Sequence, residues 1–154
     1  MSDRTLLTVT DLRTTFSIAA GDVQAVRGVS FTLDRGRTLG IVGESGCGKT
    51  VLARSIMRLN LGSNVTTTGT AEFAGRNLLS LPVADMHEMW GMELAMVFQD
   101  PMTSLNPLVR VGRQVTEHLR HHLGVGRAEA ARTAVDLLNE VRIPEPEARL
   151  RAYP

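Results

Sequence analysis

The segment from Gly43 to Thr50 constrains this chain more than any other part of its sequence. Its residues, GESGCGKT, fit the pattern G-x-x-x-x-G-K-[ST], which is typical of loops that hold the phosphates of a nucleoside triphosphate. Lys49 is the only lysine of the chain, and every other residue of the Lys and Arg class is arginine. A planar guanidinium cannot replace a compact ammonium at such a site, so this exception to the arginine bias supports a phosphate-binding loop.

The expected chemistry of the loop follows from its residue types. Glycines let the backbone curl so that successive N–H groups point inward at phosphate oxygens, and a helix starting near Gly48 adds the positive end of its dipole. Lys49 is expected to reach the β- and γ-phosphates, and the Thr50 hydroxyl to ligate Mg²⁺. The side chain of Glu44 should point away, because a carboxylate would repel the triphosphate. The predicted nucleotide-binding residues are Gly43, Ser45, Gly46, Cys47, Gly48, Lys49 and Thr50.

Length and composition limit the class of protein. A chain of 154 residues allows one domain, and its net charge of +1 with interspersed signs gives no electrostatic footprint for nucleic acid or an anionic membrane. No apolar run is long enough to span a bilayer, and the first residues lack a signal-peptide core. The single cysteine, Cys47, cannot form an internal disulfide and fits a reducing compartment. We therefore expect a cytoplasmic protein.

The first two thirds of the chain predict an α/β fold. Alternating apolar residues predict antiparallel strands over Leu6–Phe16 and Val23–Leu33, and the Thr-rich segment Val65–Ala74 predicts a third strand of the same layer. Two short apolar runs, Thr38–Val42 and Leu94–Phe98, are expected to be buried parallel strands. The first of these runs enters the glycine loop, so strand, loop and helix occur in the required order.

Helical periodicity follows the loop and dominates the last third of the chain. A helix after Thr50 is expected to end at Asn60–Gly62, and a short helix is expected over Val83–Trp90. The apolar stripes that predict the first of these helices and two later ones are Leu52, Ile56 and Leu59; Val111, Val115, Leu119 and Leu123; and Ala130, Ala134, Leu137, Leu138 and Val141. Three histidines, His118, His121 and His122, share part of one helical face; they suit a metal ion, but a solvated helix face is the favoured interpretation.

The run from Met96 to Pro107, MVFQDPMTSLNP, resembles the ATP-binding subunits of ABC transporters, and the resemblance covers essentially the whole chain. Together with GESGCGKT it is similar to the oligopeptide, dipeptide and nickel importer branch. The resemblance implies a P-loop NTPase core over residues 1–106, which includes the antiparallel β layer, and the start of a helical subdomain over 107–154. It also implies ATP and Mg²⁺ as cofactors, and ATP hydrolysis that drives uptake of peptides or a related small solute.

The resemblance assigns roles to two residues outside the loop. In this family the glutamine that matches Gln99 contacts Mg²⁺ and the attacking water, and an amide suits this role because it both donates and accepts hydrogen bonds. An aromatic residue of the first β layer stacks on adenine, and Phe16 is the candidate by position, with a core phenylalanine as the alternative. Lys49 and Gln99 would then be the catalytic residues, and Thr50 and Gln99 the metal ligands.

The resemblance also implies partners and a location. The partners would be transmembrane permease subunits, a second ATP-binding subunit and, indirectly, a substrate-binding protein, with no nucleic acid. The location would be cytoplasmic, peripheral on the inner face of the cell membrane. The 154 residues contain no LSGGQ-like signature, no apolar strand ending in an acidic pair and no switch histidine. The sequence therefore resembles the N-terminal portion of an importer ATPase, cut inside its helical subdomain, and we expect it not to be active alone.

Two other functions remain open from the residues. A small P-loop nucleotide kinase would use Ala95–Phe98 as its second phosphate-site strand and Asp100 as its Mg²⁺ carboxylate, but no arginine-rich lid pattern supports it. An inert or partner-binding fragment is the non-enzymatic alternative, because the motifs needed for turnover are missing.

Overall fold

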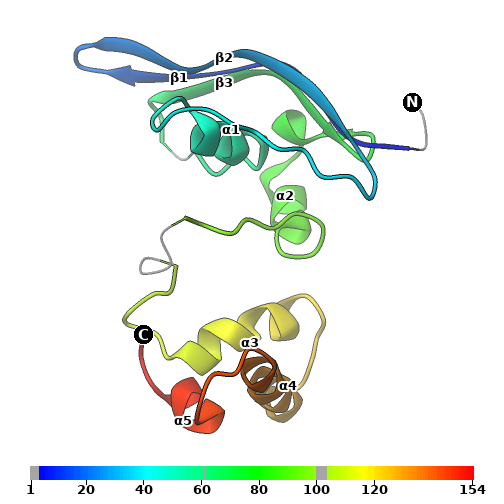
Figure 1. Ribbon diagram of the computed structural model, residues 1–154, viewed down its shortest axis with the longest axis vertical. Coiled ribbons are helices and arrows are strands. Elements are labelled where there is room, and N and C mark those ends of the chain that lie inside the picture. The colour runs from blue at the N-terminus through cyan, green and yellow to red at the C-terminus, as the bar shows by residue number, and fades with distance from the viewer. Residues whose placement is uncertain (1–3, 61, 100–103) are drawn as a thin grey trace. The chain divides into compact units, whose positions relative to one another are not determined.

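The chain forms two compact units, Met1–His87 and Glu88–Pro154, and each is described by itself (Figure 1). The computed structural model describes residues 4–60, 62–99 and 104–154. A short helix, α2 (Val83–Met89), contains the position at which the first unit ends. This helix confirms the one predicted over Val83–Trp90.

The first unit is built on an antiparallel sheet with the strand order β2-β1-β3-β4. Its strands are β1 (Thr5–Ile18), β2 (Gly21–Asp34), β3 (Val65–Phe73) and β4 (Arg76–Asn77). The three long strands confirm the predicted antiparallel layer. The two-residue strand β4 is too short to show a pattern; it follows a turn in which Ala74 and Gly75 both have positive φ, 48° and 82°. A 3₁₀ turn, η1 (Leu78–Ser80), comes next.

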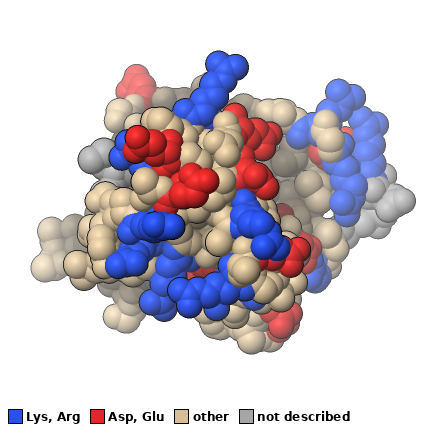
Figure 2. Space-filling model, turned by 90° about the horizontal axis from the view of Figure 1, so that it is seen from below, with Lys and Arg blue, Asp and Glu red and all other residues tan. Residues whose placement is uncertain are grey.

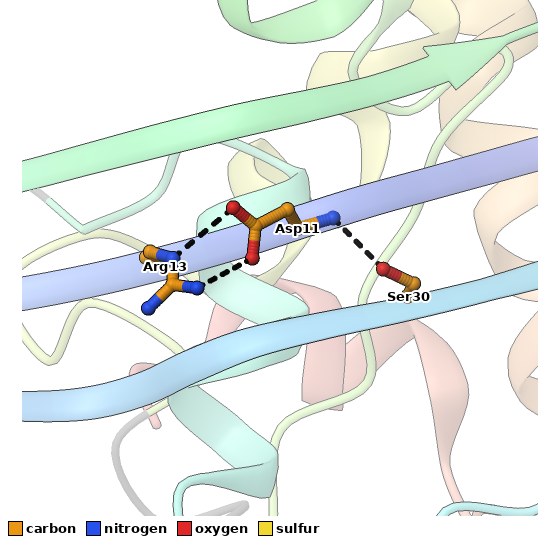
Figure 3. Close-up of polar contacts among 3 residues, drawn as sticks. All are labelled: Asp11, Arg13 and Ser30. Carbon is orange, nitrogen blue, oxygen red and sulfur yellow. Dashed lines mark hydrogen bonds and ion pairs between the residues drawn. The ribbon is translucent and has the colours of Figure 1, made fainter.

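A bulge interrupts β1 at Asp11 (Figure 3). Asp11 has φ 44°, its N–H donates to Ser30 Oγ at 2.9 Å, and Arg13 donates to both of its carboxylate oxygens, at 3.2 and 2.8 Å. The side-chain hydrogen bonds to Asp11 and the negative charge of its carboxylate raise the pKa of Arg13. Because a bulge adds one residue, Val9 and Leu12 both face the core despite their odd spacing.

The helix after the loop, α1 (Lys49–Ile56), packs on one face of this sheet (Figure 1). Leu52 and Ile56 are buried, as the predicted stripe requires. The predicted end at Asn60–Gly62 is wrong, because Arg58 adopts φ 55° and the N–H of Leu59 turns back to Arg54 O at 2.8 Å. This left-handed termination usually uses glycine, so an arginine gave no signal of it.

The prediction of two buried parallel strands, Thr38–Val42 and Leu94–Phe98, is wrong. Neither run forms a ladder; Leu94 makes only an isolated bridge with Trp90. Val42 and Val97 are 93% and 96% exposed. A strand is stabilised by hydrogen bonds to a neighbour, and the described sheet offers no parallel neighbour to either run.

After α2, the described residues of the second unit form the helices α3 (Val111–His121), α4 (Arg127–Glu140) and α5 (Pro146–Arg151). The first two confirm the predicted helices. The stripe of α4 is narrower than expected, since Ala130 and Ala134 are buried whereas Leu137 and Val141 are exposed. Helix α5 packs closely against α3, because a Cβ added to Gly112 of α3 would lie 2.6 Å from Leu150 O of α5. Among the described residues, no helix has the length and apolar character needed to cross a membrane.

Candidate functional site

The loop from Gly43 to Thr50 leads directly into α1, as the motif requires. Gly48 is the N-cap of this helix, and it has φ 96° and no side chain to cap the first turn. The first N–H groups of an α-helix have no partner within the helix, so they can donate to an anion. The end of the loop thus presents hydrogen-bond donors together with the positive end of a helix dipole.

Two glycines of the loop have no room for a side chain. A Cβ on Gly48 would lie 2.4 Å from Ala25 O, and a Cβ on Gly43 would lie 2.6 Å from Cys47 Sγ. The first distance shows that the loop lies against β2. The second shows that Gly43 and Cys47 lie close to each other within the loop. Such a compact backbone is what a phosphate cradle needs, so the residues present fit a nucleotide phosphate group.

Lys49 places its ammonium group within the loop. Its Nζ donates to Gly43 O at 2.8 Å and to Glu44 O at 2.7 Å, and it lies 3.6 Å from Cys47 Sγ. Glu44 thus contributes its backbone carbonyl, and its side chain is exposed, in line with the expectation. The two carbonyls hold the cation of Lys49 within the loop, and its contact with phosphate oxygens stays a prediction.

A cavity of about 670 Å³ lies between the loop and β2. Its volume is within the usual range of small-molecule sites. The β2 side carries valines and an alanine together with Gln24 and Arg27, and the loop side carries Lys49, so two cations line the cavity and suit an anionic ligand. The lining residues that frame it from the two sides are Val23, Ala25, Val26, Ile41, Cys47 and Lys49.

Phe16 does not line this cavity. It is half-buried in β1, where it pairs with Val23 on one side and Val65 on the other. Val23, which is 49% exposed, borders the cavity instead. Adenine stacking by Phe16 stays a prediction. The contributions of Val23 and Ala25 were missed because their nearness to the loop depends on the packing of β2 and not on a local pattern.

The predicted metal ligands lie in different parts of the chain. Thr50 is exposed on the first turn of α1, in the first unit. Gln99 is exposed in a segment without regular structure, in the second unit. Asp100, which the kinase hypothesis needs, falls outside the described residues. The roles of Thr50 and Gln99 at Mg²⁺ stay predictions.

Two histidines at the end of α3, His118 and His121, lie near His122, which directly follows the helix. Ring centroids are 5.1 Å apart for His118 and His122 and 4.8 Å apart for His121 and His122. Throughout the described part of the chain, no group of three or more His, Cys, Asp or Glu residues is arranged to hold a metal ion.

Comparison with solved structures identifies the fold. The chain superimposes on an ATP-binding cassette, described as the dimeric post-hydrolysis state bound to ADP and Pi, with a TM-score of 0.77 and 18% identity. The match covers 97% of this chain and 62% of the other. The expected fold class, an α/β P-loop NTPase core with an antiparallel layer and helices, is thereby confirmed, although the two runs expected to be parallel strands form no ladder.

Comparison of sequences identifies the family. The chain is 43% identical to the dipeptide transport ATP-binding protein of Lactococcus lactis, covering 100% of this chain and 44% of the relative. It is 48% identical to the oligopeptide transport ATP-binding protein of Salmonella typhimurium, covering 97% of this chain and again 44% of the relative. The chain thus spans less than half the length of these relatives. Because the ABC transporter family model also matches residues 26–153, the chain belongs to the ABC transporter family.

Proposed function

We propose that this chain is part of the ATP-binding subunit of an ABC importer that takes up peptides or a related small solute. The observation that carries the proposal is the loop from Gly43 to Thr50, in which Gly48 lies too close to Ala25 O for a side chain and Lys49 donates to the loop carbonyls of Gly43 and Glu44. The relatives named as dipeptide and oligopeptide transport proteins support the substrate class.

Each part of the loop has a task in this function. The backbone N–H groups from Gly46 to Thr50 would hold the phosphates, and Lys49 would exchange its carbonyl partners for phosphate oxygens. Thr50 and Gln99 would hold Mg²⁺, which when bound neutralises charge on the transferring phosphoryl group. Gln99 would also orient the attacking water through its amide. The nucleoside would lie near the loop, with Phe16 of β1, which does not line the cavity beside β2, as the proposed adenine contact.

The remaining assignments concern the assembly. We propose a nucleotide-binding core over residues 1–106 and the start of a helical subdomain over 107–154, where α3, α4 and α5 lie. The partners would be transmembrane permease subunits, a second ATP-binding subunit and, through the permease, a substrate-binding protein. The dimeric cassettes among the structural neighbours support the second subunit. The location would be the cytoplasmic face of the cell membrane.

Calorimetric titration with ATP tests the proposal. Lys49→Ala is expected to weaken ATP binding about ten- to hundredfold, because charge-assisted hydrogen bonds contribute about 1.5–3 kcal/mol and about 1.4 kcal/mol is tenfold in affinity. The ATP affinity of Lys49→Arg should be little higher than that of Lys49→Ala, since a guanidinium is too broad for the position. Arg132→Ala, an exposed charge removal on α4, serves as the control and should leave affinity unchanged. Equal affinities for wild type and Lys49→Ala would exclude the phosphate-loop function.

A further inference from the structure

A second cavity, of about 830 Å³, lies within the second unit between α3, α4 and α5. We call it the arginine groove, because five arginines and a single carboxylate line it, giving a formal net charge of +4. These residues are Arg110, Arg113, Arg120, Arg127, Arg151 and Glu147. The net charge of the whole chain is only +1, so the rest of the chain compensates this local excess.

The arginines come from three helices and face one hollow. Arg113 and Arg120 are seven residues apart on α3 and therefore share a face. Arg110 precedes α3, Arg127 begins α4 and Arg151 ends α5. Figure 2 shows several Lys and Arg side chains, with Asp and Glu side chains among them, on the face seen from below. The convergence is therefore produced by the packing of the helices and not by a run of basic sequence.

Glu147 is the one carboxylate among the residues that line the arginine groove. None of the five arginines forms an ion pair with a described carboxylate, although Glu147 lines the same cavity. Arg110 instead lies over the ring of Tyr153, with 5.9 Å between its guanidinium carbon and the ring centroid. Like charges held together without counterions repel one another, and a bound anion removes that repulsion.

We propose that the arginine groove binds a multivalent phosphate anion, either as a free solute or as the headgroup of an anionic phospholipid. A guanidinium donates two parallel hydrogen bonds to phosphate, so several forks in one hollow suit a group with several oxygens. The cavity volume is within the range of small-ligand sites. Leu108, at the same cavity, is 85% exposed and offers an apolar contact beside the anion. This site is additional to the nucleotide-binding function of the loop.

Two probes distinguish the sources of the phosphate. Inorganic pyrophosphate, titrated calorimetrically, tests a free anion, and vesicles of phosphatidylcholine with or without phosphatidylglycerol, in a flotation assay, test a headgroup. All proteins in these assays carry Lys49→Ala, so that binding of the probes to the phosphate loop contributes less to the measured signal. Binding to pyrophosphate alone assigns a free anion, binding to the phosphatidylglycerol vesicles alone assigns a lipid, and binding to both supports the shared phosphate chemistry. Binding to neither overturns the proposal.

Matched variants locate the binding. Arg113→Gln with Arg120→Gln removes two charges from the arginine groove and is expected to weaken binding about tenfold or more, as charge-assisted hydrogen bonds are lost. Arg127→Gln with Arg151→Gln tests the other two helices in the same way. Arg132→Gln with Arg149→Gln removes the same charge from exposed positions on α4 and α5 that do not line the cavity. Equal weakening by groove and control pairs, with all variants folded by circular dichroism, would overturn the site.

Discussion

Gly48 and Gly46 differ in what limits their substitution, and this difference gives a test of the loop. Both have positive φ, 96° and 82°, so Ala at either position costs about 1–2 kcal/mol in backbone strain. Only Gly48 also lies against Ala25 O, whereas a Cβ on Gly46 would meet nothing within 4 Å. Gly48→Ala is therefore expected to destabilise the fold more than Gly46→Ala in urea unfolding. Gly126→Ala, at a glycine with negative φ and open space, is the control; equal losses at positions 46 and 48 would contradict the contact with β2.

Cys47 should report on nucleotide binding. Its thiol is exposed, its Sγ lies 3.6 Å from Lys49 Nζ, and it precedes the start of α1. Alkylation with N-ethylmaleimide should block ATP binding, because the adduct fills the loop, and saturating Mg-ATP should slow the alkylation. Cys47→Ser gives the background, since it leaves no cysteine. Labelling at one rate with and without Mg-ATP would place Cys47 outside the phosphate site.

The compact conformation of the loop from Gly43 to Thr50 was predictable because its requirements lie at consecutive positions, whereas its binding of phosphate stays a prediction. Gly43, Gly48 and Lys49 carry their conformational and charge requirements in one short pattern, and the structure brings them together. The cavity wall at Val23 and the arginine groove were not predictable, because residues far apart in the sequence form them. The net charge of +1 gave no indication of the arginine groove, since a sum over the whole chain does not show where the charges lie.

A buried polar network fastens α1 to the sheet. Ser55 is 2% exposed; its Oγ lies 2.7 Å from Thr14 Oγ1 of β1, accepts from Asn60 Nδ2 at 2.7 Å and donates to Val51 O at 2.7 Å. Ser55→Ala leaves the partners in Thr14 and Asn60 without this oxygen, so we expect a loss of about 1–3 kcal/mol in the free energy of unfolding. Urea denaturation measures it. Ser63→Ala, in an exposed turn, should change little, and similar losses in both variants would mean that the network does not stabilise α1.

Local signals predicted the elements whose stability is local. The antiparallel strands and the helices α3 and α4 follow from alternation and helical periodicity within each segment. The two expected parallel strands depend instead on neighbours elsewhere in the chain, and an apolar run alone does not supply them. The end of α1 depends on Arg58 adopting a conformation that its residue type rarely takes.

The exposed apolar runs should limit the solubility of the chain. Val42 and Val97 are almost fully exposed in segments that make no ladder, and such segments can pair with another copy. Val42→Thr with Val97→Thr is expected to raise the protein concentration at which light scattering begins. Val141→Thr, at a 65% exposed valine just after α4, is the control and should raise it less. An unchanged onset in the double variant would show that these runs do not drive association.

The 154-residue chain is expected to bind nucleotide without turning it over. Hydrolysis needs a positioned water, Mg²⁺ held by several ligands and compensation of the charge on the γ-phosphate. Thr50 and Gln99 would supply part of the metal shell, but the sequence contains no apolar strand ending in an acidic pair and no signature motif for a facing subunit. Steady-state phosphate release by the purified chain, with Lys49→Ala as the control, measures turnover. Mg²⁺-dependent multiple turnover that Lys49→Ala abolishes would contradict the expectation and would mean that another group, such as Asp100, supplies the missing carboxylate.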